Sequence, residues 1–192
     1  MIKLLGGSRV CSHLHVPLQS GDSGVLKQMK RNYDMEHFRD RVHEISSQSK
    51  ETLALGTDII AGFPTETDEA FDNSLALASE LPFTYMHVFP YSSRPGTQAS
   101  GLEDIVGQDK RVARASMLRS LAAWKKESYM RTQDGRTLEV LFEKKGRDGL
   151  WVGTSENYLK IKASSNADLN GSLRTLKVQV VAGGDLYGVL SR

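Results

Sequence analysis

Hydrophobic and polar positions alternate in two different ways along the chain, and the change falls near residue 131. Before it, short apolar runs alternate with segments whose apolar residues recur every three or four positions, which is typical of strand–helix units around a parallel sheet. After it, apolar and polar residues alternate with a period of two, which predicts β-strands. The pattern therefore predicts an α/β half followed by an all-β half.

In the first half, strands are predicted at 13–18, 53–61 and 85–89, with helical segments between them. One of those helices begins around 65–69, where capping hydroxyls and first-turn carboxylates favour a helix start. Three strand–helix units are too few to close a barrel or to build a full doubly wound core. This half is therefore expected to be the end of a larger α/β unit.

A long amphipathic helix is predicted over 104–131, a segment that contains no proline. Its apolar face is expected to comprise Val112, Ala115, Leu118, Leu121 and Ala122. The opposite, polar face is expected to carry the basic residues Arg111, Arg114, Arg119, Lys125 and Lys126. The period of these positions is that of a helix with one buried side.

Beyond Gly135, short strands are predicted at 138–143, 150–152, 158–162, 175–181 and 186–190, separated by glycine-containing turns. A small closed barrel of the OB-like type is the expected solution, because closure removes the exposed edges that so small an open sheet would leave. The predicted organisation is therefore an α/β domain over 1–103, a connecting helix over 104–131 and a β-barrel over 132–192.

The net charge of the 192 residues is only +2, but it is divided unevenly. Residues 1–100 carry 9 Lys and Arg against 12 Asp and Glu, a net −3, whereas residues 101–192 carry 16 against 11, a net +5. A basic C-terminal half suggests an anionic partner such as nucleic acid, although solvated surfaces that bind nothing also carry such an excess.

No apolar run approaches the length of a membrane span. The only cysteine, Cys11, excludes an internal disulfide, a zinc ribbon and a self-contained iron–sulfur cluster.

Ligands in α/β folds bind beyond the carboxyl ends of parallel strands, which here are the loops 19–21, 62–66 and 90–97. Glycines in these loops leave room for a ligand near the backbone, and Gln19, Ser20 and Thr57 offer neutral hydrogen-bonding groups suited to a ribose or an amino acid. Ordinary turns and helix caps would use the same residue types. Spacing alone leaves both interpretations open.

Three strings, taken together and in order, are much more specific. They are CSHLHVPLQSG at 11–21, TDIIAGFPTET at 57–67 and HVFPYSSRPGT at 87–97. In this order and spacing they closely resemble the radical S-adenosylmethionine methylthiotransferases, over nearly the whole chain. Within that family the string at 87–91 most resembles the branch that methylthiolates threonylcarbamoyladenosine in tRNA.

The resemblance implies the C-terminal half of a partial (β/α)6 barrel, followed by the family's RNA-binding TRAM barrel. It also implies that the strand ends border S-adenosylmethionine, through Gln19, Ser20, Gly62, Glu66, Phe89 and Tyr91. Glu66 also has a purely structural interpretation as a first-turn carboxylate. Arg94 is expected to contact substrate phosphate or carboxylate, or else to form a structural ion pair. His13, His15 and His87 are expected to be hydrogen-bonded, inward-facing strand residues rather than metal ligands, and no catalytic residue is assigned.

The TRAM-like barrel is expected to bind the backbone of tRNA through its basic side chains. These are Arg136, Lys144, Lys145, Arg147, Lys160, Lys162, Arg174 and Lys177. Trp151 and Tyr158 are candidates for stacking on an exposed base, although at strand spacing each is more often a core residue.

The chain departs from the family pattern in its cysteines. The family uses two [4Fe–4S] clusters, one held by a Cys-x3-Cys-x2-Cys motif and one by an N-terminal domain, and a single cysteine can assemble neither. The 192 residues are therefore expected to be the C-terminal part of a longer cytoplasmic enzyme, inactive alone and without a bound cofactor.

The unpaired edge of strand 13–18 is expected to promote self-association. Two rivals remain, namely a free-standing RNA-binding module and an iron-free nucleotide-binding α/β enzyme with an OB-like appendage.

Overall fold

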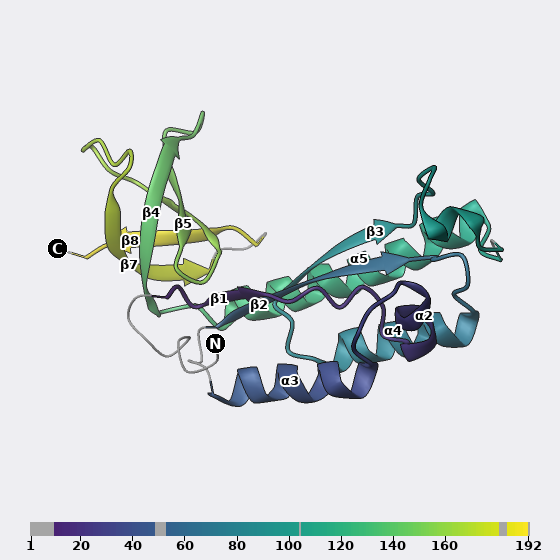
Figure 1. Ribbon diagram of the computed structural model, residues 1–192. Helices are drawn as coiled ribbons and strands as arrows, with labels where there is room; N and C mark the ends of the chain where they lie inside the picture. Colours follow the sequence, from purple (N-terminus) through teal and green to yellow (C-terminus); the bar gives the residue numbers. More distant parts are fainter. Residues whose placement is uncertain (1–9, 49–52, 104, 181–183, 192) are drawn as a thin grey trace.

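The computed structural model describes residues 10–48, 53–103, 105–180 and 184–191, and it contains a three-stranded sheet and a closed β-barrel joined by a long helix (Figure 1). The sheet part consists of β1 (His13–His15), α2 (Ser23–Gln28), α3 (Met35–Gln48), β2 (Ala54–Ala61), α4 (Asp68–Glu80), β3 (Tyr85–Pro90) and η1 (Gln98–Gly101). The long helix α5 (Gln108–Arg131) leads to β4 (Thr137–Lys145), β5 (Trp151–Ser155), β6 (Lys160–Ala163), β7 (Leu173–Val180) and β8 (Leu186–Leu190). The expected α/β part followed by a five-stranded barrel is confirmed.

The sheet is parallel and has the order β1-β2-β3, so β2 is the central strand. Most of β2 is buried, as expected of a strand with neighbours on both sides. β1 is shorter than the predicted 13–18 strand, because the chain leaves regular pairing after His15. Thr57 replaces the missing ladder bonds there, since its hydroxyl donates to the carbonyl of Val16 at 2.8 Å and accepts from the amide of Leu18 at 2.9 Å.

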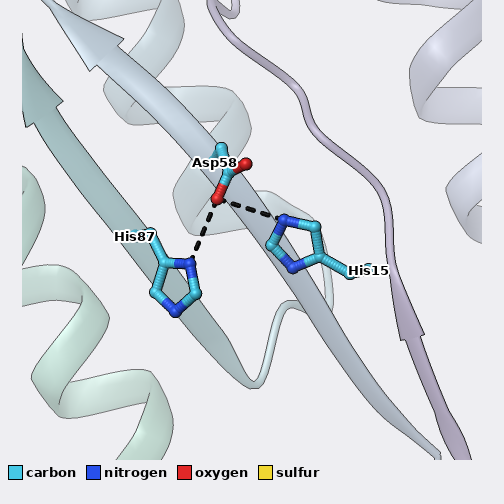
Figure 2. Close-up of side chains that lie close together, drawn as sticks. All are labelled: His15, Asp58 and His87. Atoms are coloured by element: carbon cyan, nitrogen blue, oxygen red, sulfur yellow. Dashed lines mark hydrogen bonds and ion pairs between the residues drawn. The ribbon is translucent and has the colours of Figure 1, made fainter.

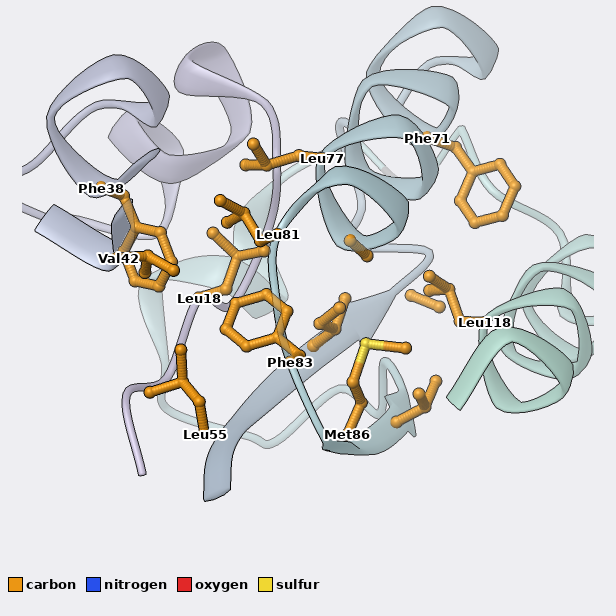
Figure 3. Close-up of a cluster of buried hydrophobic side chains, with 14 of the residues drawn as sticks. Leu18, Phe38, Val42, Leu55, Phe71, Leu77, Leu81, Phe83, Met86 and Leu118 are labelled. Atoms are coloured by element: carbon orange, nitrogen blue, oxygen red, sulfur yellow. The ribbon is translucent and has the colours of Figure 1, made fainter. Parts of the chain in front are cut away.

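One face of the sheet packs against α3, α4 and α5, and the main hydrophobic core lies between them (Figures 1 and 3). Phe38 and Val42 of α3, Leu77 of α4 and Leu118 of α5 meet in this core with Met86 of β3. Helix α4 starts where the sequence predicts, because the Thr67 hydroxyl accepts a hydrogen bond from the amide of Ala70. The helices thus bury one face of the sheet, and no helix of the described residues covers the opposite face.

Helix α5 differs from its predicted polarity. Val112 was expected on the apolar face but is 51% exposed, whereas Arg114 and Lys125 were expected on the polar face and are 3% and 8% exposed. The prediction was wrong at these positions because both cations satisfy buried oxygens of neighbouring elements. Lys125 donates to the carbonyls of Ser79 and Leu81 at 2.8 and 2.7 Å, where they end helix α4.

Arg114 joins α5 to the loop that follows β2. Its guanidinium contacts the buried carboxylate of Glu66 at 2.7 Å, the carbonyl of Glu66 at 2.9 Å and the carboxylate of Asp68 at 2.6 Å. The Glu66 oxygen that Arg114 contacts also accepts a hydrogen bond from the amide of Gly62, at 2.8 Å. The end of β2, the start of α4 and the first half of α5 are therefore fixed to one another.

The barrel closes in the order β4-β5-β6-β8-β7, with its own core of alternate strand residues such as Val140, Phe142 and Ile161. The end of α5 belongs to this core, because Met130 packs within it. The Asn157 amide donates to the Tyr129 hydroxyl and to the Gln133 side chain, both at 2.9 Å. Helix α5 is thus attached to the sheet at one end and to the barrel at the other. None of the described helices is long and apolar enough to span a membrane.

Replacing Arg114 by Met should lower the free energy of unfolding by about 3 to 5 kcal/mol, because the Glu66 carboxylate would remain buried without its cation. Denaturant unfolding measures this loss. Lys110→Met is the matched control, since Lys110 also pairs with Asp68 but is exposed, and its loss should stay within about 1 kcal/mol. Equal losses in the two variants would contradict the assigned role of the buried pair.

Candidate functional site

The face of the sheet opposite the helices carries mainly polar and aromatic side chains, together with Ala54 and Ile60 of β2. His13 and His15 extend from β1, Asp58 from β2, and Tyr85 and His87 from β3. The parallel register pairs His15 with Gly56, Gly56 with Tyr85 and Asp58 with His87, so these positions lie in adjacent rows. The three strands therefore place titratable groups side by side on a rigid surface.

Gly56 allows Tyr85 to reach across the central strand. A Cβ atom at position 56 would lie 2.0 Å from Cζ of Tyr85, so any side chain there would collide with the ring. Across the glycine, the Tyr85 hydroxyl meets Nε2 of His13 at 2.7 Å and Nδ1 of His15 at 3.1 Å. Tyr85 thereby connects the two edge strands over the top of β2.

Asp58 lies between two histidines (Figure 2). Its Oδ1 atom is 3.1 Å from Nε2 of His15 and 3.2 Å from Nδ1 of His87. Because a carboxylate only accepts, each imidazole donates a proton to it when neutral, which assigns the Nε2–H tautomer to His15 and the Nδ1–H tautomer to His87. His15 then accepts from Tyr85 through Nδ1, and Tyr85 accepts from His13. The expectation that these histidines are hydrogen-bonded agrees with these contacts, but His87 does not face inward, because its side chain is 54% exposed on edge strand β3.

Burial changes the acidity of two members of this group. The pKa of Tyr85 is raised to about 12, first by burial and then by the nearby Tyr158 and Asp58. The pKa of His13 is lowered from its ordinary value, first by burial and then by the neighbouring His15. Both shifts favour the uncharged form of these two side chains.

The barrel contributes Tyr158 to this surface. Its ring stacks on His13 with the centroids 4.3 Å apart and lies 5.6 Å from the ring of Tyr85. Tyr158 has a backbone φ of 65°, an uncommon conformation for a non-glycine residue, which presents the side chain outside the barrel. It is 54% exposed, whereas Trp151 is 7% exposed and belongs to the barrel core. Of the two aromatic candidates, only Tyr158 therefore faces a possible ligand.

A cavity of about 730 Å³ lies between the sheet, α5 and the barrel. Its lining combines aromatic and basic side chains, among them Tyr85, His87, Arg119, Lys126, Tyr158 and Lys160. Aromatic faces and cations are the groups that accommodate a nucleotide, through stacking and phosphate contacts. The cavity joins the polar face of the sheet to the basic barrel.

The carboxyl ends of the strands hold the residues expected near S-adenosylmethionine, and several of them are already engaged within the protein. Ser20 is fully buried and meets the Ser74 hydroxyl at 3.3 Å. Gly62 has a φ of 76° and lies against Arg111, where a Cβ would come within 2.4 Å of Cγ. Burial raises the pKa of Glu66, and its contacts with Gly62 and Arg114 oppose that rise. These three residues shape the loop ends.

Gln19, Phe89, Tyr91 and Arg94 are the more accessible members of the predicted set. Gln19 has a φ of 67°, and its backbone extends β1 through bonds to Asp58 and Ile60. Phe89 is 51% exposed. Tyr91 packs against the ring of Phe63 and under the guanidinium of Arg111. Arg94 is exposed, and no carboxylate of the described residues lies within ion-pair distance of it.

The basic residues of the barrel fall into different electrostatic situations. Lys160 pairs with Glu143 at 2.6 Å, and Lys162 pairs with Asp185 at 3.2 Å. Arg136 donates to the carbonyl of Thr132, and Arg174 and Lys177 lie exposed on β7. The hairpin between β4 and β5 carries Lys144, Lys145 and Arg147, and no carboxylate of the described residues forms an ion pair with these three. Among the described residues, these three cations of the hairpin and Arg174 and Lys177 of β7 are thus not paired with a carboxylate.

The residues present do not fit a [4Fe–4S] cluster, because such a cluster needs several thiolates and Cys11 is the one cysteine of the sequence. The loop ends do suit part of a nucleoside or amino-acid ligand, because accessible aromatic rings and the side-chain amide of Gln19 lie next to tight glycine turns. We therefore assign binding and positioning roles, and no redox step, to this chain.

Asp58, Tyr85 and Gly56 were not singled out from the sequence. The sequence nevertheless contains a signal for this face of the sheet. A parallel strand that is covered on both faces has a nearly continuous run of apolar residues. In β1 and β3 the polar residues instead recur at alternate positions, as in His13 and His15, and in β2 the polar residues Thr57 and Asp58 interrupt the apolar run. Such alternation marks a sheet face that is not covered by helices.

Comparison with known proteins identifies relatives over almost the whole chain, although no protein-family model matches it. Threonylcarbamoyladenosine tRNA methylthiotransferase of Bacillus subtilis is 34% identical over 183 residues, 93% of this chain and 40% of that protein. The tRNA-2-methylthio-N(6)-dimethylallyladenosine synthase of Sulfurimonas denitrificans is 35% identical over 184 residues, 94% of this chain and 42% of that protein. In Aquifex aeolicus, a threonylcarbamoyladenosine tRNA methylthiotransferase is 31% identical over 92% of this chain. The chain spans about 40% of the length of these relatives.

Acidification should weaken the junction between His13, Tyr85 and Tyr158. Because the folded-state pKa of His13 is lowered, its contribution to stability is complete above the unfolded value of about 6.5 and is lost as the pH falls through the folded value. Urea unfolding at about pH 7.5 and about pH 5 should show a larger loss of stability for the unaltered protein than for His13→Gln. His37→Gln, at an exposed position on α3, should behave like the unaltered protein. Identical pH dependence in all three proteins would exclude this role of His13.

Proposed function

Because this chain belongs to the radical S-adenosylmethionine tRNA methylthiotransferase family, we propose that it forms the part of such an enzyme that binds tRNA and completes the S-adenosylmethionine pocket. The observation that carries the proposal is the match over 93% of the chain, which takes in both the sheet and the barrel. The reaction of the whole enzyme would insert sulfur into, and methylate, a hypermodified adenosine beside the anticodon in cytoplasmic tRNA.

S-adenosylmethionine and two [4Fe–4S] clusters would supply the radical chemistry in the whole enzyme. For this chain we propose the complementary task of holding the ligand at the strand ends. Gln19, Phe89 and Tyr91 would contact it, while Ser20, Gly62 and Glu66 would keep the loops in place. Arg94, exposed beyond β3, would contact a phosphate or carboxylate of the substrate. Without cysteines for a cluster, the chain alone would bind and not react.

The barrel would bind the tRNA backbone through its basic hairpin. Lys144 and Lys145 at the end of β4 and Arg147 in the turn that follows have no carboxylate partner among the described residues, so their cations would be available for phosphates. The Lys145 Nζ atom also lies 5.8 Å from the centroid of the Trp151 ring. Lys160 and Lys162 are held by acidic neighbours and would contribute less. Arg136, Arg174 and Lys177 would extend the contact along β4 and β7.

Replacing Lys144, Lys145 and Arg147 together by Ala should weaken tRNA binding and flatten its salt dependence. The log–log slope of affinity against salt is about −0.9 per phosphate contact on duplex regions, so the triple variant should lose roughly three units of slope. Fluorescence anisotropy with labelled tRNA over a salt series measures both quantities. Affinity should depend little on the anticodon-loop sequence, because phosphate contacts carry no sequence information.

A matched triple variant tests whether net charge alone explains the effect. Lys27, Arg31 and Arg41 are exposed basic residues on the helical side of the sheet part, and their replacement by Ala removes the same charge. This control should keep the affinity and slope of the unaltered protein. Equal losses in both triple variants, or unchanged binding in the hairpin variant, would refute the hairpin as the RNA contact.

We also propose that the chain self-associates through the edge of β1. Among the described residues, β1 pairs only with β2, which leaves one side of its backbone available to another strand. Sedimentation velocity over a wide concentration range should show a dimer that dissociates on dilution. A monomer at every concentration would rule out this edge as an interface.

A further inference from the structure

The His15, Asp58 and His87 side chains bring three metal-binding atoms together on three adjacent strands. One ring nitrogen of His15, a carboxylate oxygen of Asp58 and one ring nitrogen of His87 all lie within 4.8 Å of one another (Figure 2). We propose that these residues form a binding site for a divalent transition-metal ion such as Zn²⁺. This inference is independent of the proposed tRNA function and involves no iron–sulfur chemistry.

The separations of the ligand atoms fit such an ion. Two ligands that each lie about 2.0–2.1 Å from a tetrahedral Zn²⁺ are about 3.3 Å apart. Oδ1 of Asp58 is 3.1 Å from the His15 nitrogen and 3.2 Å from the His87 nitrogen. An ion placed among them would need only a small adjustment, which His87 can make by rotating, since its side chain is 54% exposed on edge strand β3.

The contacts around the ligands match those of known metal sites. A ligating histidine usually donates its other ring N–H to an oxygen, which fixes the tautomer and the ring orientation. Nδ1 of His15 lies 3.1 Å from the Tyr85 hydroxyl, which is held in turn by Nε2 of His13 at 2.7 Å. Tyr85 is therefore a positioning residue for His15, and Gly56 leaves the space that its ring requires.

Binding requires no net release of protons when both imidazoles are neutral. The proton on Nε2 of His15 moves to Nδ1, where the Tyr85 oxygen accepts it, and Tyr85 then donates to Nε2 of His13, whose own proton moves to Nδ1. The proton on Nδ1 of His87 moves to Nε2, on an exposed ring. The ion takes the place of both N–H···O bonds to Asp58. Two imidazoles and one carboxylate leave a fourth position for water on the open side of the sheet.

Isothermal titration with Zn²⁺ tests the site in the full 192-residue chain. Cys11 is exposed and two residues from His13, so the titrations use Cys11→Ser as the background to remove the thiolate. One Zn²⁺ per chain should bind in a saturable manner. Asp58→Asn and His87→Gln should each weaken binding at least tenfold, and Tyr85→Phe should weaken it by about 10- to 100-fold.

His43→Gln is the matched control, because His43 also faces a carboxylate, Glu80, at 3.4 Å on the helical surface. Its affinity should equal that of the background protein, and circular dichroism without metal should confirm that every variant is folded. Co²⁺ should give tetrahedral absorption bands that disappear in Asp58→Asn. Absence of saturable binding, or binding that survives both Asp58→Asn and His87→Gln, would identify an adventitious ion only and overturn the proposal.

Discussion

The buried contact between Arg114 and Glu66 determines how the parts of this molecule meet. A carboxylate that is 1% exposed costs considerable free energy to bury unless a cation and a hydrogen-bond donor compensate for it. Here Arg114 comes from α5 and the amide of Gly62 from the loop after β2, so compensation fixes both elements. The interactions of the Glu66 carboxylate therefore fix the loop after β2 and helix α5, which leads to the barrel, relative to each other.

The sequence predicted the order and type of elements well, because both periodicities are strong in this chain. The helix start at Thr67 and the barrel strands follow from local rules of capping and alternation. The burial of Arg114 and Lys125 could not be predicted from local rules, since their oxygen partners Glu66, Ser79 and Leu81 lie more than 40 residues away in sequence. Helical periodicity assigns a cation to solvent, and only tertiary structure supplies the buried acceptor.

The same limit applies to the candidate site. The motifs located the strand ends, but the network around Asp58 depends on register between three strands and on the empty space above Gly56. Sequence reasoning treated the histidines one by one. In the structure the Tyr85 hydroxyl meets both His13 and His15 from the opposite edge strand, and Asp58 meets both His15 and His87. The chemistry of this face is therefore a property of the sheet as a whole.

Helix α5 also sets a length scale. Its 24 residues correspond to about 36 Å at the usual rise per residue. The helix begins beside the loop that holds Gly62 and ends inside the barrel core. A polynucleotide in contact with both regions would have to cover that distance, which is roughly ten stacked bases at about 3.4 Å each. A short hairpin loop would therefore reach both ends of the helix only together with part of its stem.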